Sequence, residues 1–470
     1  MASSCNKSFA NSYLLLNQED ANFIDLLLLL ISPNLGKRNF VDTSSEDGYL
    51  KGNFRQRWLI FISIVGQKLL QLVNKPLALF GSFVEMFINL VNLNNGIVML
   101  IFNTITGEVI LPDPKSEKYL SCVGHLDARV NLDAVKRDDI RYYVALSMMA
   151  SKASYENEAF IKTTVQDKWK MEFVGFFTCR NEYQGKSETQ VMIFLDKNEE
   201  HDTYVVAFRG TEPFDADDWC SDIDLSWYEI PQVGRIHGGF MKALGLQKNL
   251  GWPKEIKQDK SLSPFAYYVV RDILRKSLSE NNNAKFIVTG HSLGGALAIL
   301  FGTILSLHEE KLLLNRLEGI FTFGQPRIGD EDYANYMNNK FKEHSIMYRR
   351  FVYCNDIVPR LPYDNKEMMF KHFGICLFFN RRYELEILEE EWNKNYFSLW
   401  CVIPMAFNAI LELIRSFTIG YQNGPHFKEG WFLFAFRIIG LIFPGLPAHG
   451  PQDYLNSTLL GSIEKHLKIE

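Results

Sequence analysis

The chain has 470 residues, 47% of them hydrophobic, and a formal net charge of −5. This length predicts one large catalytic domain with extensions, or two domains, and the acidic balance excludes a nucleic-acid-binding protein. Seven cysteines are dispersed without C-x-x-C pairs or metal-ligand spacing, which favours reduced thiols in a cytosol-facing protein over a secreted disulfide framework. We find no zinc, EF-hand, P-loop or dinucleotide fingerprint, so neither a metal nor another cofactor is expected.

Residues 1–135 are predicted to form an N-terminal extension around a hydrophobic block at about 54–111. Before this block, the apolar run Phe23–Ile31 follows Glu19 and Asp20, where a secretory signal would carry basic residues. We therefore expect a helix there and no signal peptide.

The block itself has the composition of a membrane-associated segment. Residues 86–107 carry no charge, which is long enough for a bilayer span, but the asparagines among them are costly in hydrocarbon. Positions 84, 87, 88 and 91 share one helical face, and the polar positions 85, 89 and 92 share the opposite one. This favours a helix lying in an interface, or a re-entrant hairpin turning around Asn74–Pro76. Packing against the core and a true span stay open as alternatives.

Residues 136–470 are predicted to form an α/β domain, because strand patterns alternate with helical ones. Such an alternation predicts a mostly parallel central sheet with helices on both faces. The expected strands are Glu172–Thr178, Gln190–Leu195, Tyr204–Phe208, Phe286–Thr289, Gly319–Phe323 and Met347–Tyr353. The expected helices are Ala145–Ser154, Phe265–Ser279, Leu293–His308, Glu331–Phe341 and a last one from Asp453 on.

A second hydrophobic segment, at about 380–445, is predicted to be a helical insertion. It contains the uncharged run Tyr396–Leu411, interrupted by Pro404, and the aromatic run Trp431–Phe443. Either this insertion is a helical hairpin that caps the core, or it is a lipid-facing surface around the mouth of a pocket.

The most informative motif is Gly290-His291-Ser292-Leu293-Gly294, which reads G-x-S-x-G. A strand pattern precedes it and a helix pattern follows it, as a nucleophile elbow requires. The glycines relieve crowding at the sharp turn, and Ser292 is predicted to stand exposed near the N-terminus of a helix, where negative charge is stabilised.

A serine nucleophile needs a base that is itself oriented by an acid, and sheet hydrolases of this kind place them in the order Ser, Asp or Glu, His. Asp356 is the expected acid because it follows the strand that ends at Tyr353. Its rivals Asp330 and Asp332 begin a helix, where an acidic residue commonly caps. His449 is the expected base, since it lies in a Gly/Pro-rich loop just before a helix. His372 is the alternative.

The oxyanion of the tetrahedral intermediate needs preorganised donors. One expected donor is the amide of Leu293, directly after the nucleophile. The other is Thr211, whose amide and hydroxyl follow the glycine turn that ends the strand at Phe208.

Several motifs in fixed order resemble class 3 lipases. These are Phe208–Thr211, Trp219 with Asp222, His237–Phe240, Gly290–Gly295, Phe323–Gly329 and Asp356–Pro362. The resemblance implies an α/β-hydrolase fold, with Thr211 completing the oxyanion hole and residues 212–218 in the lid position. It also implies a catalytic histidine ahead of a tyrosine-bearing helix, which matches His449 and Tyr454.

The hydrophobic N-terminal block and the hydrophobic insertion between Asp356 and His449 look like those of the plant oil-body lipases. That resemblance implies a triacylglycerol lipase with peripheral or monotopic attachment to a lipid droplet. A phospholipase A1 or galactolipase is the alternative enzyme, and a non-catalytic lipase-like scaffold is the alternative outside catalysis. The partners implied are an acyl-lipid substrate and a droplet monolayer or membrane surface, while homo-oligomer formation stays open.

Overall fold

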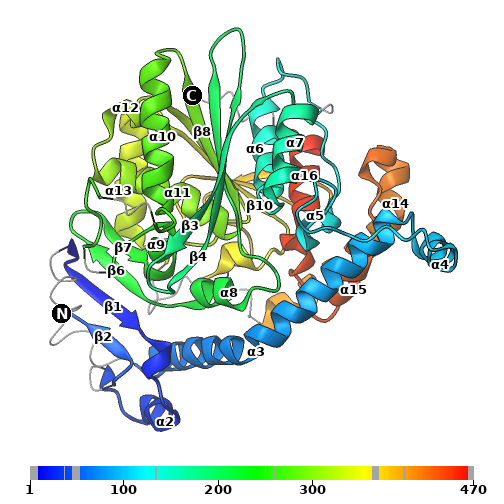
Figure 1. Ribbon diagram of the computed structural model, residues 1–470. Coiled ribbons are helices and arrows are strands. Elements are labelled where there is room, and N and C mark those ends of the chain that lie inside the picture. Colours follow the sequence, from blue (N-terminus) through cyan, green and yellow to red (C-terminus); the bar gives the residue numbers. More distant parts are fainter. Residues whose placement is uncertain are drawn as a thin grey trace.

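An eight-stranded sheet lies at the centre of the computed structural model, which describes residues 9–35, 38–44, 53–132, 135–248, 250–257, 261–362, 370–394 and 399–463 (Figure 1). The strand order is β12-β11-β10-β9-β8-β5-β4-β3. Neighbours from β5 to β11 run parallel, whereas β4 and β12 run antiparallel to their neighbours. The strands are β3 (Glu172–Asn181), β4 (Lys186–Asp196), β5 (Thr203–Phe208), β8 (Lys285–His291), β9 (Leu317–Phe323), β10 (Met347–Tyr353), β11 (Ile375–Phe379) and β12 (Leu385–Leu388).

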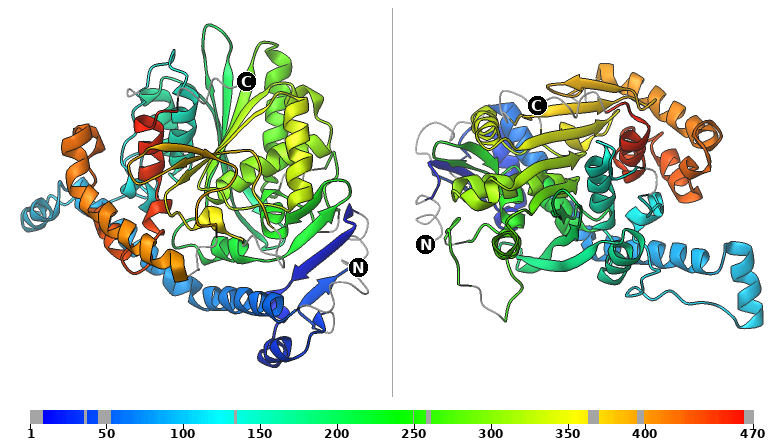
Figure 2. Two further views of the ribbon diagram at one scale, coloured as in Figure 1. Left: turned by 180° about the vertical axis from the view of Figure 1, so that it is seen from behind. Right: turned by 90° about the horizontal axis from the view of Figure 1, so that it is seen from above.

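Helices cover both faces of this sheet (Figure 2). Alternate residues of β5 enter different cores: Val206 and Phe208 pack in one cluster, and Val205 and Ala207 in the other. On the first face lie α9 (Gly238–Leu244), α10 (Ala266–Glu280), α11 (Leu293–Leu307), α12 (Lys311–Leu314) and α13 (Glu331–Glu343). On the second lie α6 (Tyr142–Ala153), α7 (Glu158–Thr163), the π-helical turn η3 (Thr164–Lys168) and α16 (Pro451–Leu460). The prediction of a mostly parallel sheet covered on both faces is confirmed.

A smaller sheet joins the N-terminal residues to the segment that follows β5. Its order is β2-β1-β6-β7, and β1 pairs antiparallel with β6, with Tyr13 opposite Tyr228. The strands are β1 (Ser12–Leu16), β2 (Val41–Thr43), β6 (Trp227–Ile230) and β7 (Gly234–His237). Helix α8 (Ala216–Ile223) directly precedes β6, so the N-terminal strands lie close to the carboxyl edge of the large sheet.

The N-terminal hydrophobic block is a 40-residue helix, α3 (Phe54–Leu93), followed by α4 (Ile97–Thr106). The expected helix at Phe23–Ile31 is present as α2, after the short turn η1 (Gln18–Asp20). The expected hairpin around Asn74–Pro76 is wrong, because α3 continues through Pro76. Contacts with the domain on both sides of the proline hold the helix together: Ser63 donates to Ile223 O before it, and Gly81 packs on Phe214 after it.

The insertion before the last helix is also helical. It contains α14 (Leu399–Asn423), the turn η5 (Pro425–Phe427) and α15 (Trp431–Ile439). Pro404, which interrupts the apolar run in the sequence, lies inside α14, and the helix continues through it. Two further turns flank the catalytic region, η4 (Val358–Arg360) and η6 (Pro447–His449), and α5 (Cys122–Leu126) lies between α3 and α15.

Candidate active site

Ser292 occupies a sharp turn between β8 and α11. Its backbone is held at φ 59 and ψ −130, a left-handed conformation that costs energy for a residue other than glycine. The Ser292 amide donates to Phe323 O at 2.9 Å, which fixes the turn against the end of β9. A Cβ on Gly290 would lie 2.6 Å from the amide nitrogen of Gly295, so only glycine fits there. The strand–turn–helix geometry expected for this motif is therefore present.

Asp356 and His449 form a direct pair although 93 residues separate them. Nδ1 of His449 lies 2.8 Å from Oδ2 of Asp356, whose side chain is fully buried. The other carboxylate oxygen accepts the Val358 amide at 2.9 Å. With Nδ1–H directed at the carboxylate, Nε2 of His449 is the ring nitrogen left to accept a proton.

This pair lies beside the turn that carries Ser292. Gly324 follows Phe323, and a Cβ at residue 324 would lie 3.0 Å from ring atoms of His449 and 2.8 Å from Oδ2 of Asp356. The imidazole and the carboxylate thus sit at the end of β9, which pairs with β8 on one side and β10 on the other. The structure brings Ser292, Asp356 and His449 together at the carboxyl edge of three neighbouring strands.

Two further side chains hold this arrangement, and the sequence analysis assigned neither of them such a contact. Tyr454 donates its hydroxyl to Oδ2 of Asp356 at 2.5 Å, the same oxygen that faces His449. His291 bonds through Nε2 to the carbonyl oxygen of His449 at 2.8 Å and through Nδ1 to the hydroxyl of Tyr155 at 2.9 Å. Burial, and then His449, lower the pKa of His291 well below its ordinary value, so this imidazole is neutral. The only sequence signals were the adjacency of His291 to the nucleophile and the matching position of Tyr454.

The two expected oxyanion donors leave the sheet next to each other. β5 pairs in parallel with β8, with Phe208 opposite Gly290, and Thr211 and Leu293 each lie three residues after this pair. A Cβ on Gly210 would lie 2.5 Å from the carbonyl oxygen of His291, and Leu293 is the first residue of α11. Amides at a helix N-terminus lack intrahelical partners and favour negative charge.

The rival residues lie elsewhere. Asp330 caps α13 by accepting the amides of Tyr333 at 3.0 Å and Arg235 at 3.1 Å, and Asp332 lies in the first turn of the same helix. Nε2 of His372 bonds to the carbonyl oxygen of Pro359 at 2.7 Å, and this ring is buried. None of these three residues pairs with His449 among the described contacts, in which its Nδ1 faces Asp356.

The segment after Thr211 packs against α3, both in residues 212–218, which the sequence analysis placed in the lid position, and in α8. Ser63 donates to Ile223 O at 2.6 Å, and the thiol of Cys220 lies 3.7 Å from Gln67 O. The rings of Phe80 and Phe214 meet edge to face with centroids 5.8 Å apart. Ser292 is only 6% exposed, so the expectation that its side chain stands exposed is wrong for this conformation.

Comparison with known proteins identifies the family. A family model described as Lipase (class 3) matches residues 205–366, which include Thr211, Ser292 and Asp356. A Nicotiana tabacum protein named "Triacylglycerol lipase OBL1" is 41% identical, and the alignment covers 86% of this chain and 83% of that protein. The chain belongs to the class 3 lipase family. The resemblance inferred from the motifs is confirmed.

Other plant relatives of this class 3 lipase carry the same name. The Arabidopsis thaliana protein is 41% identical over 90% of this chain and 86% of its own length. The Ricinus communis protein is 32% identical over 97% of this chain and 96% of its own length. Among solved structures, the Rhizomucor miehei lipase propeptide complex aligns with 24% identity and a TM-score of 0.38, over 52% of this chain and 70% of that one.

Proposed function

We propose that this class 3 lipase hydrolyses triacylglycerol at the surface of a lipid droplet, with Ser292 as nucleophile, His449 as base and Asp356 as the orienting acid. The observation that carries the proposal is the Asp356–His449 hydrogen bond next to the strained Ser292 turn. The names of the plant relatives, which cover most of the chain, support triacylglycerol as the substrate.

The geometry gives each residue a step in acyl transfer. Ser292 Oγ attacks the ester carbonyl carbon while Nε2 of His449 takes the hydroxyl proton, and the carboxylate of Asp356 stabilises the imidazolium that forms. Thr211 and Leu293 donate to the oxyanion of the tetrahedral intermediate. His449 then returns the proton to the leaving alcohol oxygen. A water molecule, deprotonated by His449, attacks the acyl-enzyme and releases the fatty acid.

The orientation of α3 supports docking on lipid. Two of its polar side chains bond to the protein: Glu85 accepts the Cys122 amide at 2.9 Å, and Asn89 exchanges hydrogen bonds with the backbone of Leu120 at 2.8 and 3.0 Å. Many of its apolar side chains turn outward, although Ile60, Ile64, Ile88 and Val91 are buried against the protein. An exposed apolar face of this size is unusual for a helix in a water-soluble domain. The exposed apolar residues of α3 are Phe54, Trp58, Ile62, Leu69, Leu72, Val73, Leu79, Phe80, Phe83, Met86 and Phe87.

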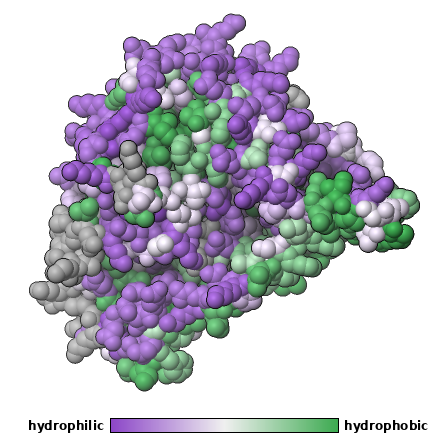
Figure 3. All heavy atoms as spheres, in the orientation of Figure 1, coloured by the Kyte–Doolittle hydropathy of each residue, from purple (hydrophilic) through white to green (hydrophobic). Residues whose placement is uncertain are grey.

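Other segments extend this apolar surface. Figure 3 shows hydrophobic residues along the edge formed by α3, at α2 and at the tip near α4. α14 and α15 also expose large apolar side chains, among them Trp400, Ile403 and Trp431. His125 of α5 lies between α3 and α15. Its Nδ1 lies 3.2 Å from Nδ2 of Asn92 in α3, and its ring meets that of Phe432 in α15 edge to face, with centroids 6.3 Å apart.

The charges of α3 suit a phospholipid monolayer. The exposed charged side chains on this helix are basic, Arg55 and Lys75, and its one acidic residue, Glu85, faces α5. Basic residues beside an apolar face favour anionic lipid surfaces. α3 and α14 are each long and apolar enough to cross a membrane, but both pack one face on the domain. We therefore infer that they lie on the lipid surface.

The activity is tested with purified protein on triolein emulsion, phosphatidylcholine vesicles and a galactolipid. Release of fatty acid from triolein, abolished by Ser292→Ala, is the expected result. Preferred hydrolysis of either polar lipid would establish the phospholipase or galactolipase alternative, and full turnover by Ser292→Ala would reject the mechanism. Binding of a partner without hydrolysis of any lipid would favour a scaffold.

The location is tested by flotation with triolein droplets coated with phospholipid. Deleting residues 54–111 would also remove Ile60 and Ile64 from a buried cluster, so point substitutions are sharper. Phe83→Glu and Trp400→Glu should reduce flotation, because both side chains are exposed on the proposed docking surface. Leu312→Glu, at an exposed position of α12 on the opposite side of the protein, is the matched control. Equal flotation of all variants would contradict docking through this surface.

A further inference from the structure

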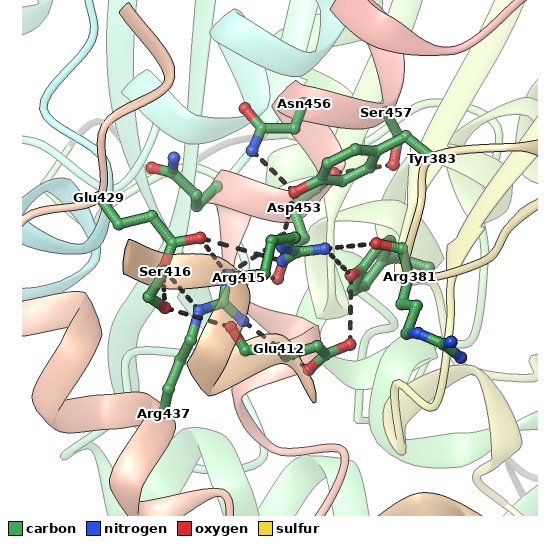
Figure 4. Close-up of polar contacts among 12 residues, drawn as sticks. Arg381, Tyr383, Glu412, Arg415, Ser416, Glu429, Arg437, Asp453, Asn456 and Ser457 are labelled. Carbon is green, nitrogen blue, oxygen red and sulfur yellow. Dashed lines mark hydrogen bonds and ion pairs between the residues drawn. The ribbon is translucent and has the colours of Figure 1, made fainter. Parts of the chain in front are cut away.

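A buried charged cluster ties the hydrophobic insertion to the helix that follows His449 (Figure 4). It contains Glu412 and Arg415 of α14, Glu429 just before α15, Arg437 of α15 and Asp453 of α16. Their side chains are between 1% and 13% exposed. The insertion thus has an outer side of large apolar residues and an inner side of paired charges.

Asp453 is the point where the insertion meets α16. Its carboxylate accepts Nη2 of Arg415 at 2.6 Å, Nη2 of Arg437 at 3.1 Å and the hydroxyl of Tyr383 at 2.8 Å. Burial opposes its ionisation, but Arg437 and Arg415 outweigh burial and lower the pKa of Asp453 below its ordinary value. Asp453 is therefore a carboxylate held by two cations that come from two different helices.

The rest of the cluster balances these charges. Arg437 also donates two hydrogen bonds to Glu429, both at 2.6 Å. Burial and the nearby Asp453 raise the pKa of Glu412, so a proton on Glu412 would leave two guanidinium groups facing two carboxylates. A balanced cluster of this kind is rigid, because breaking one pair would leave an uncompensated buried charge.

This cluster reaches the proposed catalytic pair from two sides. Tyr454, the neighbour of Asp453, donates to Oδ2 of Asp356 at 2.5 Å. Tyr353, the last residue of β10 before Asp356, accepts Nη1 of Arg415 at 2.6 Å and donates to Glu412 at 3.1 Å. The first turn of α16 and the end of β10 are therefore held in register by the same arginine.

We propose that Asp453 is a positioning residue for the Asp356–His449 pair, and that Arg415 and Arg437 set the geometry of this pair through it. The inference rests on the proposed function, since it assigns a role within that site. The insertion separates Asp356 from His449 in sequence. Its buried charges hold α16 and the end of β10 in fixed positions, so that the two residues can meet. Asp453 does not touch substrate, so its loss should slow the chemical step and leave substrate binding unchanged. A displacement of about 1 Å costs on the order of 100-fold in rate.

The test compares Asp453→Asn with Ser416→Ala on a dissolved butyrate ester. Ser416 lies in α14 beside Arg415 and donates to Glu429 at 2.6 Å, so its loss perturbs the cluster without removing a contact of Asp453. Asp453→Asn should lower kcat at least about 10-fold, with KM and binding to phosphatidylcholine vesicles unchanged. Ser416→Ala should leave kcat unchanged. Arg415→Lys, which keeps a cation near Asp453, should retain more activity than Arg415→Gln.

A structural role alone would give a different pattern. The rate at which a fluorophosphonate labels Ser292 reports how well the base activates the serine, and the final extent of labelling reports the folded fraction. If Asp453 is a positioning residue, Asp453→Asn should be labelled more slowly than the wild type but to the same final extent. A folded Asp453→Asn protein with wild-type kcat, or a loss of activity matched by a lower extent of labelling, would overturn the proposal. Should this variant not fold, Tyr383→Phe removes only one donor to Asp453 and is read in the same way.

Failure of the proposed function would look different. In that case the wild-type protein would hydrolyse no ester, or Ser292→Ala would stay active. An active wild type, an inactive Ser292→Ala and an unimpaired Asp453→Asn would refute the positioning role alone.

Discussion

Phe214 packs on Gly81 of α3 so closely that a Cβ at residue 81 would lie 2.5 Å from Cβ of Phe214. Phe214 lies between the proposed oxyanion residue Thr211 and α8, in the segment that resembles the lid. The helix proposed to dock on lipid is therefore in direct contact with the segment beside the buried Ser292. Movement of α3 relative to the domain would release that contact.

Gly81→Leu should separate α3 from Phe214 and raise the hydrolysis of a dissolved short-chain ester measured without lipid. The added side chain cannot fit beside the Phe214 ring, so we expect residues 212–218 to shift and Ser292, which is 6% exposed, to become more accessible. We expect lipid binding to move α3 away from Phe214 as well, so activity on a triolein emulsion should change less. The ratio of the two rates is the measurement.

Phe83→Ala is the matched control for this substitution. Phe83 lies on the same helix but is 69% exposed, so its loss should weaken lipid binding and leave the rate on the dissolved ester unchanged. The coupling of α3 to residues 212–218 is refuted if Gly81→Leu and Phe83→Ala give the same ratio of rates.

Asp356→Asn should lower kcat about 10⁴-fold, because the amide no longer holds His449 with Nδ1 protonated. Asp330→Asn is the control: Asp330 caps α13 by accepting the Tyr333 amide, and asparagine caps a helix equally well. The control should keep both activity and stability. Steady-state kinetics on the same ester compares the two variants, and comparable activity of both would remove Asp356 from the mechanism.

Tyr155→Phe should destabilise the protein by about 1–3 kcal/mol, since it removes the donor to Nδ1 of the buried His291. It should also lower kcat, because His291 holds the carbonyl oxygen of His449. Tyr143→Phe is the control, because it removes a comparable hydroxyl from α6. That hydroxyl lies 3.0 Å from the hydroxyl oxygen of Thr203 and is not part of the site. Urea unfolding and kcat are measured for both. A fall in kcat caused equally by Tyr143→Phe would contradict a specific role of Tyr155.

Glu156→Gln should remove a pH dependence of stability. Burial raises the pKa of Glu156 from 4.5 to about 7, so the folded protein binds this proton more tightly than the unfolded chain does. The resulting stabilisation is fully present below pH 4.5 and is lost as the pH rises to 7. Glutamine does not ionise, so the stability of the variant relative to wild type should rise by about 3 kcal/mol between pH 4 and pH 8. Urea unfolding across this range measures the difference, and parallel curves would contradict it.

The large sheet could be predicted because its parallel strands are short apolar runs buried on both faces. All six expected strands are present, and β10 has the predicted bounds Met347–Tyr353. β11 and β12 were missed, since they lie beside the hydrophobic insertion and carry no distinct turn signal. The pairing of β1 with β6 was also missed, because residues 215 apart, such as Tyr13 and Tyr228, leave no local pattern.

The site residues could be predicted from their order in the chain, but the contacts that hold them in place could not. Ser292, Asp356 and His449 each stand after or before a recognisable element, so their convergence could be expected from the topology. The sequence analysis assigned no role to the charged side chains of the insertion. Their role as partners of Asp453 depends on how α14, α15 and α16 pack together, which a single sequence does not specify. The turn expected at Pro76 was wrong because contacts with α8 overrode a local signal.

The outward-facing apolar side chains of α3 and α14 also affect how the isolated protein behaves in water. Trp400 is 88% exposed and Tyr421 is 93% exposed, and patches of this kind associate when no lipid covers them. Molecules purified without detergent should therefore cluster through this surface, with particle sizes that grow with concentration. Adding detergent micelles should disperse such clusters. The physiological oligomeric state should therefore be measured while detergent or lipid covers this apolar surface.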